Sequence, residues 1–181
     1  MTRRGLLKSL GCLGLVLAGS SLSYGSLFVS EGLMEGARSL NLYALNTGES
    51  LRVVYWMEGT YLDSSLREIY HLLRDHRNGQ VHPIDVRLLD LLYMITKLSG
   101  RNRIVVISGY RSTQSNEYLY RKGRGVARES YHTKGMAVDI RVEGLPLQTL
   151  RDLALSLRAG GVGYYPSSGF VHLDTGEFRH W

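Results

Sequence analysis

Residues 130–139 read Ser-Tyr-His-Thr-Lys-Gly-Met-Ala-Val-Asp and place two metal-binding residue types, His132 and Asp139, on either side of a glycine. The alternating apolar run that begins at Met136 predicts a strand ending near Val142, with Asp139 among apolar neighbours. A carboxylate buried in such surroundings is costly unless it is paired or bound to a metal. This stretch therefore predicts a strand whose one acidic side chain has a partner elsewhere in the chain.

A second imidazole, His172, lies in the run Phe-Val-His-Leu-Asp at residues 170–174, which has strand character. The side-chain period of two puts His172 and Asp174 on one side of that strand, so Asp174 can contact His172 or a water beside it. On spacing alone two interpretations stay open. Either His132, Asp139 and His172 are ordinary structural side chains, or they hold one zinc ion, since a catalytic zinc needs three such ligands and one open position.

The composition of the 181 residues fits one folded domain. Hydrophobic residues make up 44% and charged residues 21%, which argues against wholesale disorder. The net charge of +6 belongs partly to the basic N-terminus, and the remaining excess is too small for a nucleic-acid-binding surface. Cys12 is the only cysteine, so there is no internal disulfide and any metal must be held by imidazole and carboxylate.

The first 25 residues have the pattern of an export signal. A basic start containing Arg3 and Arg4 precedes an apolar run rich in Leu and Gly and then small residues. The paired arginines resemble a twin-arginine signal, which is used for proteins exported after folding. We predict an export signal over residues 1–25, a mobile segment over 26–38 and a periplasmic product that meets the membrane only transiently. An uncleaved signal anchor is the alternative.

Residues 39–181 alternate between strand and helix patterns and predict one α+β domain. Two β-rich runs flank Asn46-Thr47-Gly48-Glu49 and predict a hairpin. Helical spacing predicts one helix from Asp63 and another over 86–99, which Gly100 ends. The other expected elements are a buried strand over 104–107, a short helix over 113–122 with Tyr118 and Leu119 inward, a helix from Pro146 to about Ala159, and a glycine-rich loop over 160–163.

Several motifs resemble a known family of zinc peptidases. The pattern Ser130-x-His132-x-x-Gly135-x-Ala137-x-Asp139 with a later His172 resembles the signature of the zinc D-Ala-D-Ala metallopeptidases and their hedgehog-like relatives. The similarity covers nearly all of the chain beyond residue 35 and is closest to the murein endopeptidase K-like branch. It implies an α+β fold with a small antiparallel sheet, flanking helices and a zinc site on the sheet. The further motifs that carry it are residues 46–49, 108–112, 160–166 and 170–176.

The resemblance also implies roles for individual residues. His132, Asp139 and His172 correspond to the ligands of one zinc ion. Arg111 corresponds to an arginine that binds the carbonyl or carboxylate of the substrate, where a guanidinium can neutralise a developing oxyanion. Ser130 either contacts the substrate or is a loop-forming hydroxyl.

The general base is where the chain departs from the family pattern. Many relatives carry a Glu, Asp or His three to five residues before the last ligand, whereas this chain has Ser167-Ser168-Gly169 there. Asp174 is the best remaining base because it shares a strand face with His172, and His180 is a distant second. The alternative role for Asp174 is only to orient His172.

Taken together, the resemblance implies an exported zinc metallopeptidase that hydrolyses the peptide cross-links of peptidoglycan during remodelling of the cell wall. In this scheme Asp174 takes a proton and Arg111 steadies the oxyanion. Two alternatives stay open. One is a D-Ala-D-Ala carboxypeptidase or dipeptidase with the same zinc site. The other is a zinc-containing wall-binding protein without turnover, which the departure at the base position makes relevant.

Overall fold

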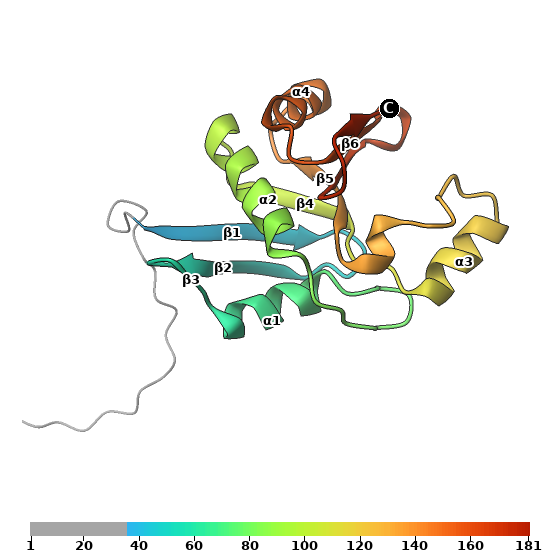
Figure 1. Cartoon of the computed structure of the whole chain (residues 1–181), viewed down its shortest axis with the longest axis horizontal. Helices are drawn as coiled ribbons and strands as arrows, with labels where there is room; N and C mark the ends of the chain where they lie inside the picture. Colours follow the sequence, from blue (N-terminus) through green and yellow to red (C-terminus); the bar gives the residue numbers. More distant parts are fainter. Residues whose placement is uncertain (1–35) are drawn as a thin grey trace, which may run out of the picture. The chain divides into compact units, whose positions relative to one another are not determined.

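An eight-stranded mixed sheet runs through residues 36–181, the part of the chain that the computed structural model describes (Figure 1). The strand order is β3-β2-β1-β4-β5-β7-β6-β8, and only β1–β4 and β6–β8 are parallel pairs. The strands are β1 Ala37–Ala44, β2 Ser50–Met57, β3 Thr60–Tyr61, β4 Arg103–Ser108, β5 Ala137–Val142, β6 Gly161–Tyr165, β7 Phe170–Asp174 and β8 Arg179–His180.

The α+β class is confirmed, but the sheet is larger than expected and is not purely antiparallel. Parallel neighbours need a crossover connection of a dozen or more residues. The chain supplies one between β2 and β4, where α1 (Asp63–Leu72) and α2 (Val86–Ser99) return it to the side of β1. The other helices of the described residues are α3 (Thr113–Arg121) and α4 (Leu147–Leu157), with short 3₁₀ turns η1 (Tyr131–Lys134) and η2 (Pro166–Ser168).

The predicted second helix and hairpin are confirmed. The side chain of Asp85 accepts a hydrogen bond from the backbone N–H of Arg87 and so caps α2, which ends where Gly100 adopts a left-handed conformation with φ of 65°. Helices α1, α2 and α4 pack with the sheet into one hydrophobic core, whereas α3 lies apart from them beside η1 and the 123–129 loop (Figure 1).

The two faces of the sheet have different chemistry, and the strand register separates them. Val138 and Ile140 of β5 pair with Leu173 and Val171 of β7, and all four belong to the buried apolar core. Because side chains alternate along a strand, the residues between them take the opposite face. Asp139 and His172 therefore lie side by side on the face turned away from the core, and Asp174 joins them there.

The domain begins earlier than expected. β1 starts at Ala37, and Arg38 makes an ion pair of 2.7 Å with Asp90 while its guanidinium lies 4.3 Å from the centre of the Trp56 ring. The predicted start at residue 39 is thus two residues late, since Ala37 and Arg38 already pair with β2. The predicted export signal over 1–25 and most of the segment over 26–38 lie outside the described residues. None of the helices in the described part is both long and apolar enough to cross a membrane.

Two local expectations are wrong. The glycine-rich run forms part of β6 rather than a loop, because backbone pairing with β7 and β8 needs no side chains and the glycines leave room for larger neighbours. In α3, Tyr118 is 58% exposed, and Ser115 and Asn116 are the buried residues. This helix packs on a polar network instead of the apolar core, so hydrophobicity indicated the wrong side.

Candidate metal centre

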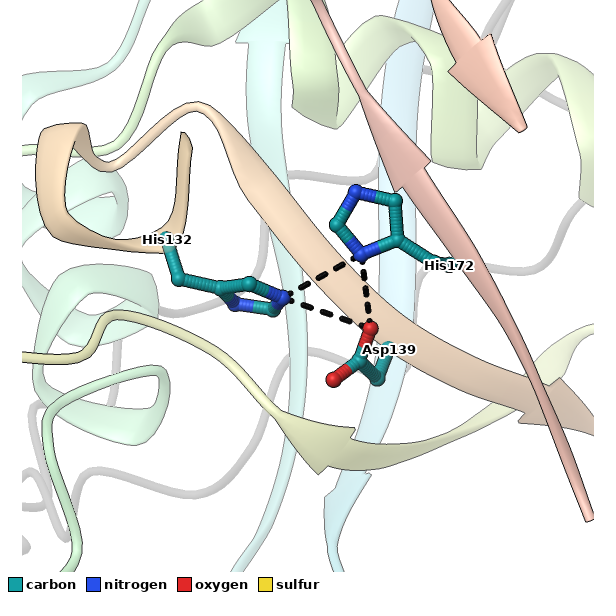
Figure 2. A group of neighbouring side chains, drawn as sticks. All are labelled: His132, Asp139 and His172. Atoms are coloured by element: carbon teal, nitrogen blue, oxygen red, sulfur yellow. Dashed lines mark hydrogen bonds and ion pairs between the residues drawn. The ribbon is translucent and has the colours of Figure 1, made fainter. Parts of the chain in front are cut away.

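Three donor atoms converge on the sheet face opposite the core (Figure 2). The Nε2 atom of His132 lies 3.2 Å from Nδ1 of His172 and 3.3 Å from Oδ1 of Asp139. Nδ1 of His172 lies 2.8 Å from the same carboxylate oxygen. His132 comes from η1, Asp139 from β5 and His172 from β7, so residues 40 positions apart in the chain meet at one point. This set of atoms can hold a metal ion.

His132 is held in place by its own turn. Ser130 precedes η1 and its hydroxyl accepts a hydrogen bond from the backbone N–H of His132, which caps the turn. Gly135 ends the turn in a left-handed conformation, and a Cβ there would collide with the carbonyl of Pro83. Nδ1 of His132 lies 2.7 Å from the carbonyl of Gly109 and can donate to it, which leaves Nε2 facing Asp139 and His172.

His172 is oriented from its other side by Asp174. Nε2 of His172 lies 3.1 Å from Oδ2 of Asp174, which leaves Nδ1 facing the other two donors. Asp174 is fully buried, and Arg179 donates to both of its oxygens at 3.1 and 2.7 Å. The backbone N–H groups of Gly161 and Gly176 donate to Oδ1 as well. Asp174 therefore lies behind the imidazole, away from the point where the three donors meet.

The charges in this cluster depend on one another. Burial opposes ionisation of Asp139, but the charge and hydrogen bonds of His132 and His172 outweigh it and hold the pKa of this carboxyl well below its usual range. Burial likewise opposes the charge on Asp174, and hydrogen bonds from His172 and Arg179 lower its pKa. Both carboxyls are therefore ionised at neutral pH, as a cation site requires.

Arg111 lies next to the cluster with hydrogen-bonding capacity to spare. It is 6% exposed, and its Nη2 atom lies 4.0 Å from Oδ2 of Asp139. Nη1 donates to the side-chain oxygen of Asn116 at 3.1 Å, while Nε is buried and has no hydrogen-bond partner among the described residues. A buried guanidinium N–H without a partner is costly, and Arg111 also lines the groove next to Asp139.

The cluster opens into a groove of about 800 Å³. Ser130 lines it, and so do Tyr165 and Trp181, whose Nε1 donates to the Tyr165 hydroxyl at 2.7 Å. The Trp181 ring lies 5.4 Å from the ring of His172. Gly163 makes this possible, because a Cβ there would come within 2.7 Å of the Trp181 ring. One side of the site therefore has an aromatic wall.

The structure thus brings together most of the residues that the sequence singled out. His132, Asp139, His172 and Arg111 meet in the groove, and Ser130 lines it while capping η1. His180 does not reach the site. It pairs with Val162, a core residue, and so lies on the opposite face of the sheet from His172.

Sequence reasoning missed the supports around the site. Asp75 is fully buried and accepts hydrogen bonds from the backbone N–H and hydroxyl of Ser112, at 2.9 and 2.7 Å, beside Arg111. Arg179 and Trp181 lie in the C-terminal stretch, where no sequence pattern singled them out. Asp75 lies two residues after the buried Leu72 and Leu73, and an acidic residue so close to a buried apolar pair was the signal that could have identified it.

Comparison with known proteins gives matches over almost the same range as this fold. A family model described as peptidoglycan L,D-endopeptidase MepK matches residues 33–181. The peptidoglycan L,D-endopeptidase MepK of Escherichia coli (strain K12) is 48% identical over 145 residues, which cover 80% of this chain and 80% of that protein. The probable peptidoglycan L,D-endopeptidase MepK of Haemophilus influenzae is 45% identical over 146 residues, which cover 80% of this chain and 78% of that protein.

Proposed function

Because the chain belongs to the peptidoglycan L,D-endopeptidase MepK family, we propose that it hydrolyses the peptide cross-links of peptidoglycan with the help of one zinc ion. Endopeptidase activity on peptidoglycan follows from the family, and neither a carboxypeptidase nor a wall-binding protein without turnover is favoured by the matches. The relatives are named L,D-endopeptidases, which supports a bond between an L-centre and a D-centre as the one that this chain cleaves. The convergence of His132, Asp139 and His172 carries the zinc part of the proposal.

The donor set fits zinc. In a tetrahedral site with bonds of about 2.0 Å, ligand atoms lie about 3.3 Å apart. The separations of 3.2 and 3.3 Å from Nε2 of His132 match this value, and the 2.8 Å between Asp139 and His172 is a hydrogen-bond distance that an ion would widen. Two imidazoles and one carboxylate, each with an outer hydrogen-bond partner or charge partner, leave one position for the reaction. When bound, such an ion polarises a peptide carbonyl and lowers the pKa of water.

Arg111 has the position of an oxyanion-stabilising residue. Its Nη2 atom lies beside Asp139, and Arg111 lines the groove, so the guanidinium is placed to meet an oxygen of the substrate. Asn116 fixes the guanidinium from the other end, and its own amide donates to the carbonyls of Ala127 and Arg128. A donor held in this way costs little reorganisation as negative charge develops on the scissile carbonyl.

We assign Asp174 to the orientation of His172 rather than to proton transfer. It is fully buried, and its oxygens are occupied by His172, Arg179 and two backbone N–H groups. A general base must lie within hydrogen-bond reach of the proton that it takes. Asp174 keeps the proton of His172 on Nε2 and so leaves Nδ1 free as a ligand. Asp139 is the only carboxylate among the described residues that line the groove, so in this proposal the proton acceptor is a group other than a carboxylate side chain.

The cellular part of the proposal rests on the N-terminal sequence. Residues 1–25, with Arg3 and Arg4, support export by a twin-arginine route to the periplasm, where cross-linked peptidoglycan is found. A fusion of residues 1–35 to a reporter that is active only after export would test this directly, with Arg3→Lys and Arg4→Lys as the matched control.

Metal analysis and muropeptide digestion test the enzymatic part. The chain is expected to hold one zinc per molecule and to convert cross-linked muropeptide dimers into monomers. Zinc removal should stop the reaction and zinc addition should restore it. Release of terminal D-Ala alone would support the carboxypeptidase, and binding to sacculi without release of peptides would overturn the enzyme.

A further inference from the structure

Cationic side chains dominate the groove around the site. The positively charged residues that line it are Arg77, Arg111, Arg124 and Arg179, and Asp139 is the only acidic lining residue in the described part of the chain. Because Asp139 belongs to the metal centre, it does not offset the charge of the outer groove. The surroundings of a bound substrate are therefore strongly positive.

Two of these four arginines do not pair with an acidic side chain of the described residues. Arg111 is engaged with Asn116, and Arg179 with Asp174. Arg77 and Arg124 are exposed, and neither side chain forms an ion pair with a carboxylate of residues 36–181. Other arginines of the described residues form ion pairs with acidic side chains: Arg38 with Asp90, Arg74 with Glu49, Arg87 with Asp85, Arg103 with Glu143, Arg121 with Glu117 and Arg151 with Asp152.

The backbone that carries Arg77 is fixed against the site. The N–H of Arg77 donates to Oδ1 of Asp75 at 3.0 Å, and Oδ2 of Asp75 holds Ser112 at the start of α3. Asn78 adds a hydrogen bond of 2.9 Å to the Ser112 hydroxyl. These hydrogen bonds hold the backbone at residue 77 against the start of α3, beside Arg111, and so limit where its side chain can reach.

The segment that carries Arg124 is tied to α3 in the same way. The backbone N–H of Arg124 donates to the carbonyl of Leu119 at 3.1 Å. Beyond it, the side chain of Asn116 holds two carbonyls of the 123–129 loop. Arg77 and Arg124 thus reach one groove from two separate loops that share α3 as their support.

The positive charge of this region already affects a titratable side chain of the protein. The pKa of His76 lies below its usual value, first because of burial and then because the positive charges of Arg77 and Arg111 outweigh the negative charge of Asp75. A negative group placed here would meet the opposite, favourable interaction. Peptides of peptidoglycan supply such groups, because D-glutamate and diaminopimelate leave carboxylates free on both sides of a cross-link.

We propose that Arg77 and Arg124 form an arginine rim that binds the free carboxylates of the peptide substrate and so selects acidic over amidated peptides. The inference rests on the proposed function, since it takes a peptidoglycan peptide as the occupant of the groove. The rim acts on binding and leaves the bond-breaking step to the metal centre and Arg111. Guanidinium groups suit this task because they form paired hydrogen bonds with carboxylates.

Calorimetry of the zinc-loaded full chain tests the rim. The probes are an uncross-linked muropeptide with free carboxylates and the same peptide with those carboxylates amidated. The wild type should bind the free-acid form roughly 5- to 20-fold more tightly, and Arg77→Gln and Arg124→Gln should each lose about 2- to 5-fold of that preference. The double variant should bind both peptides alike. Arg67→Gln, an exposed arginine of α1 outside the groove, is the matched control and should behave as the wild type.

Failure of the rim and failure of the proposed function give different results. A double variant that keeps the preference, or a wild type that binds both peptides equally or binds neither, overturns the rim whatever the chain cleaves. A wild type that prefers the acidic peptide but never converts cross-linked dimers into monomers supports the rim and overturns the endopeptidase. Higher salt should reduce the preference of the wild type more than that of the double variant.

Discussion

Asp139 and His172 face each other directly across the β5–β7 ladder, with Oδ1 of Asp139 2.8 Å from Nδ1 of His172. Such a pair depends on register, because a slip of one residue would turn one partner into the apolar core. The core residues Val138, Ile140 and Val171 oppose that slip. Hydrophobic burial on one face of the sheet thereby fixes the geometry of the metal centre on the other.

The first prediction concerns this pair. Asp139→Ala should abolish stoichiometric metal binding and lower kcat/KM by at least about 100-fold, since even outer partners of metal ligands change affinity by about 10- to 100-fold. Metal content and muropeptide cleavage are the measurements. Arg141→Ala, an exposed position on the same strand, is the control and should keep both. One zinc per molecule in Asp139→Ala would remove Asp139 from the ligand set.

The Asp174→Asn variant tests whether Asp174 orients His172 or acts as the general base. An amide keeps the shape but replaces one acceptor oxygen with a donor, so it cannot hold both Nε2–H of His172 and Arg179. We expect metal affinity to fall by about 10- to 100-fold and most activity to return at saturating zinc. Unchanged zinc affinity together with a lost kcat at saturation would show that Asp174 is the base after all.

Arg111→Lys tests the role of the guanidinium. Lysine keeps the positive charge but loses the planar fork and the Nε donor, which has no partner among the described residues. We expect kcat/KM to fall by about 10²–10³-fold, the range for loss of one oxyanion donor, with zinc content unchanged. A variant that loses zinc in proportion to activity would instead assign Arg111 to support of Asp139.

The sequence predicted which polar side chains would meet better than it predicted their surroundings, and the reason is physical. His132, Asp139 and His172 stood out because each is a polar residue in a strand or turn pattern, and alternation placed Asp174 beside His172. The parallel pairing of β1 with β4 was missed because it joins segments separated by two helices. No local pattern encodes such a pairing.

The helix α3 was misread for a related reason. Its amphipathic pattern turned Tyr118 inward, but the neighbouring surface consists of Asp75 and Arg111, so Ser115 and Asn116 are the residues buried against it. A buried polar network cannot be deduced from hydrophobicity. The left-handed turn at Gly135 and the close approach at Gly163 also became visible only with their neighbours Pro83 and Trp181 in place.

Gly163→Ala tests the aromatic wall. A Cβ at this position would come within 2.7–2.8 Å of the rings of Trp181 and Tyr165, so Trp181 must move away from His172. Overpacking of this kind costs about 1–3 kcal/mol of the free energy of unfolding. We expect weaker substrate binding, a higher exposure of Trp181 to a fluorescence quencher and unchanged zinc content. Trp181→Ala should reproduce the binding defect without the loss of stability, and normal binding in both variants would exclude the wall from substrate contact.

Asp75 gives the fold a pH dependence that does not involve the metal centre. Burial opposes its charge, but hydrogen bonds from Ser115, Arg77 and Ser112 outweigh that and lower its pKa below the usual value of about 3.9. Since the folded chain holds the proton less tightly than the unfolded chain, the stabilisation is fully present above pH 4 or so. It is lost as the pH falls through the folded-state pKa.

Asp75→Asn should therefore lower stability at neutral pH and flatten its loss in acid. All the groups around the carboxylate are donors, so an amide N–H₂ would face an N–H or O–H without an acceptor. A charged acceptor of this kind is worth about 1.5–3 kcal/mol. The midpoint temperature of thermal unfolding at pH 7 should fall by roughly 5–10 °C, and its difference from the wild-type value should shrink at acidic pH. A difference that stays constant at pH values below the folded-state pKa would mean that the contribution of Asp75 does not depend on its charge.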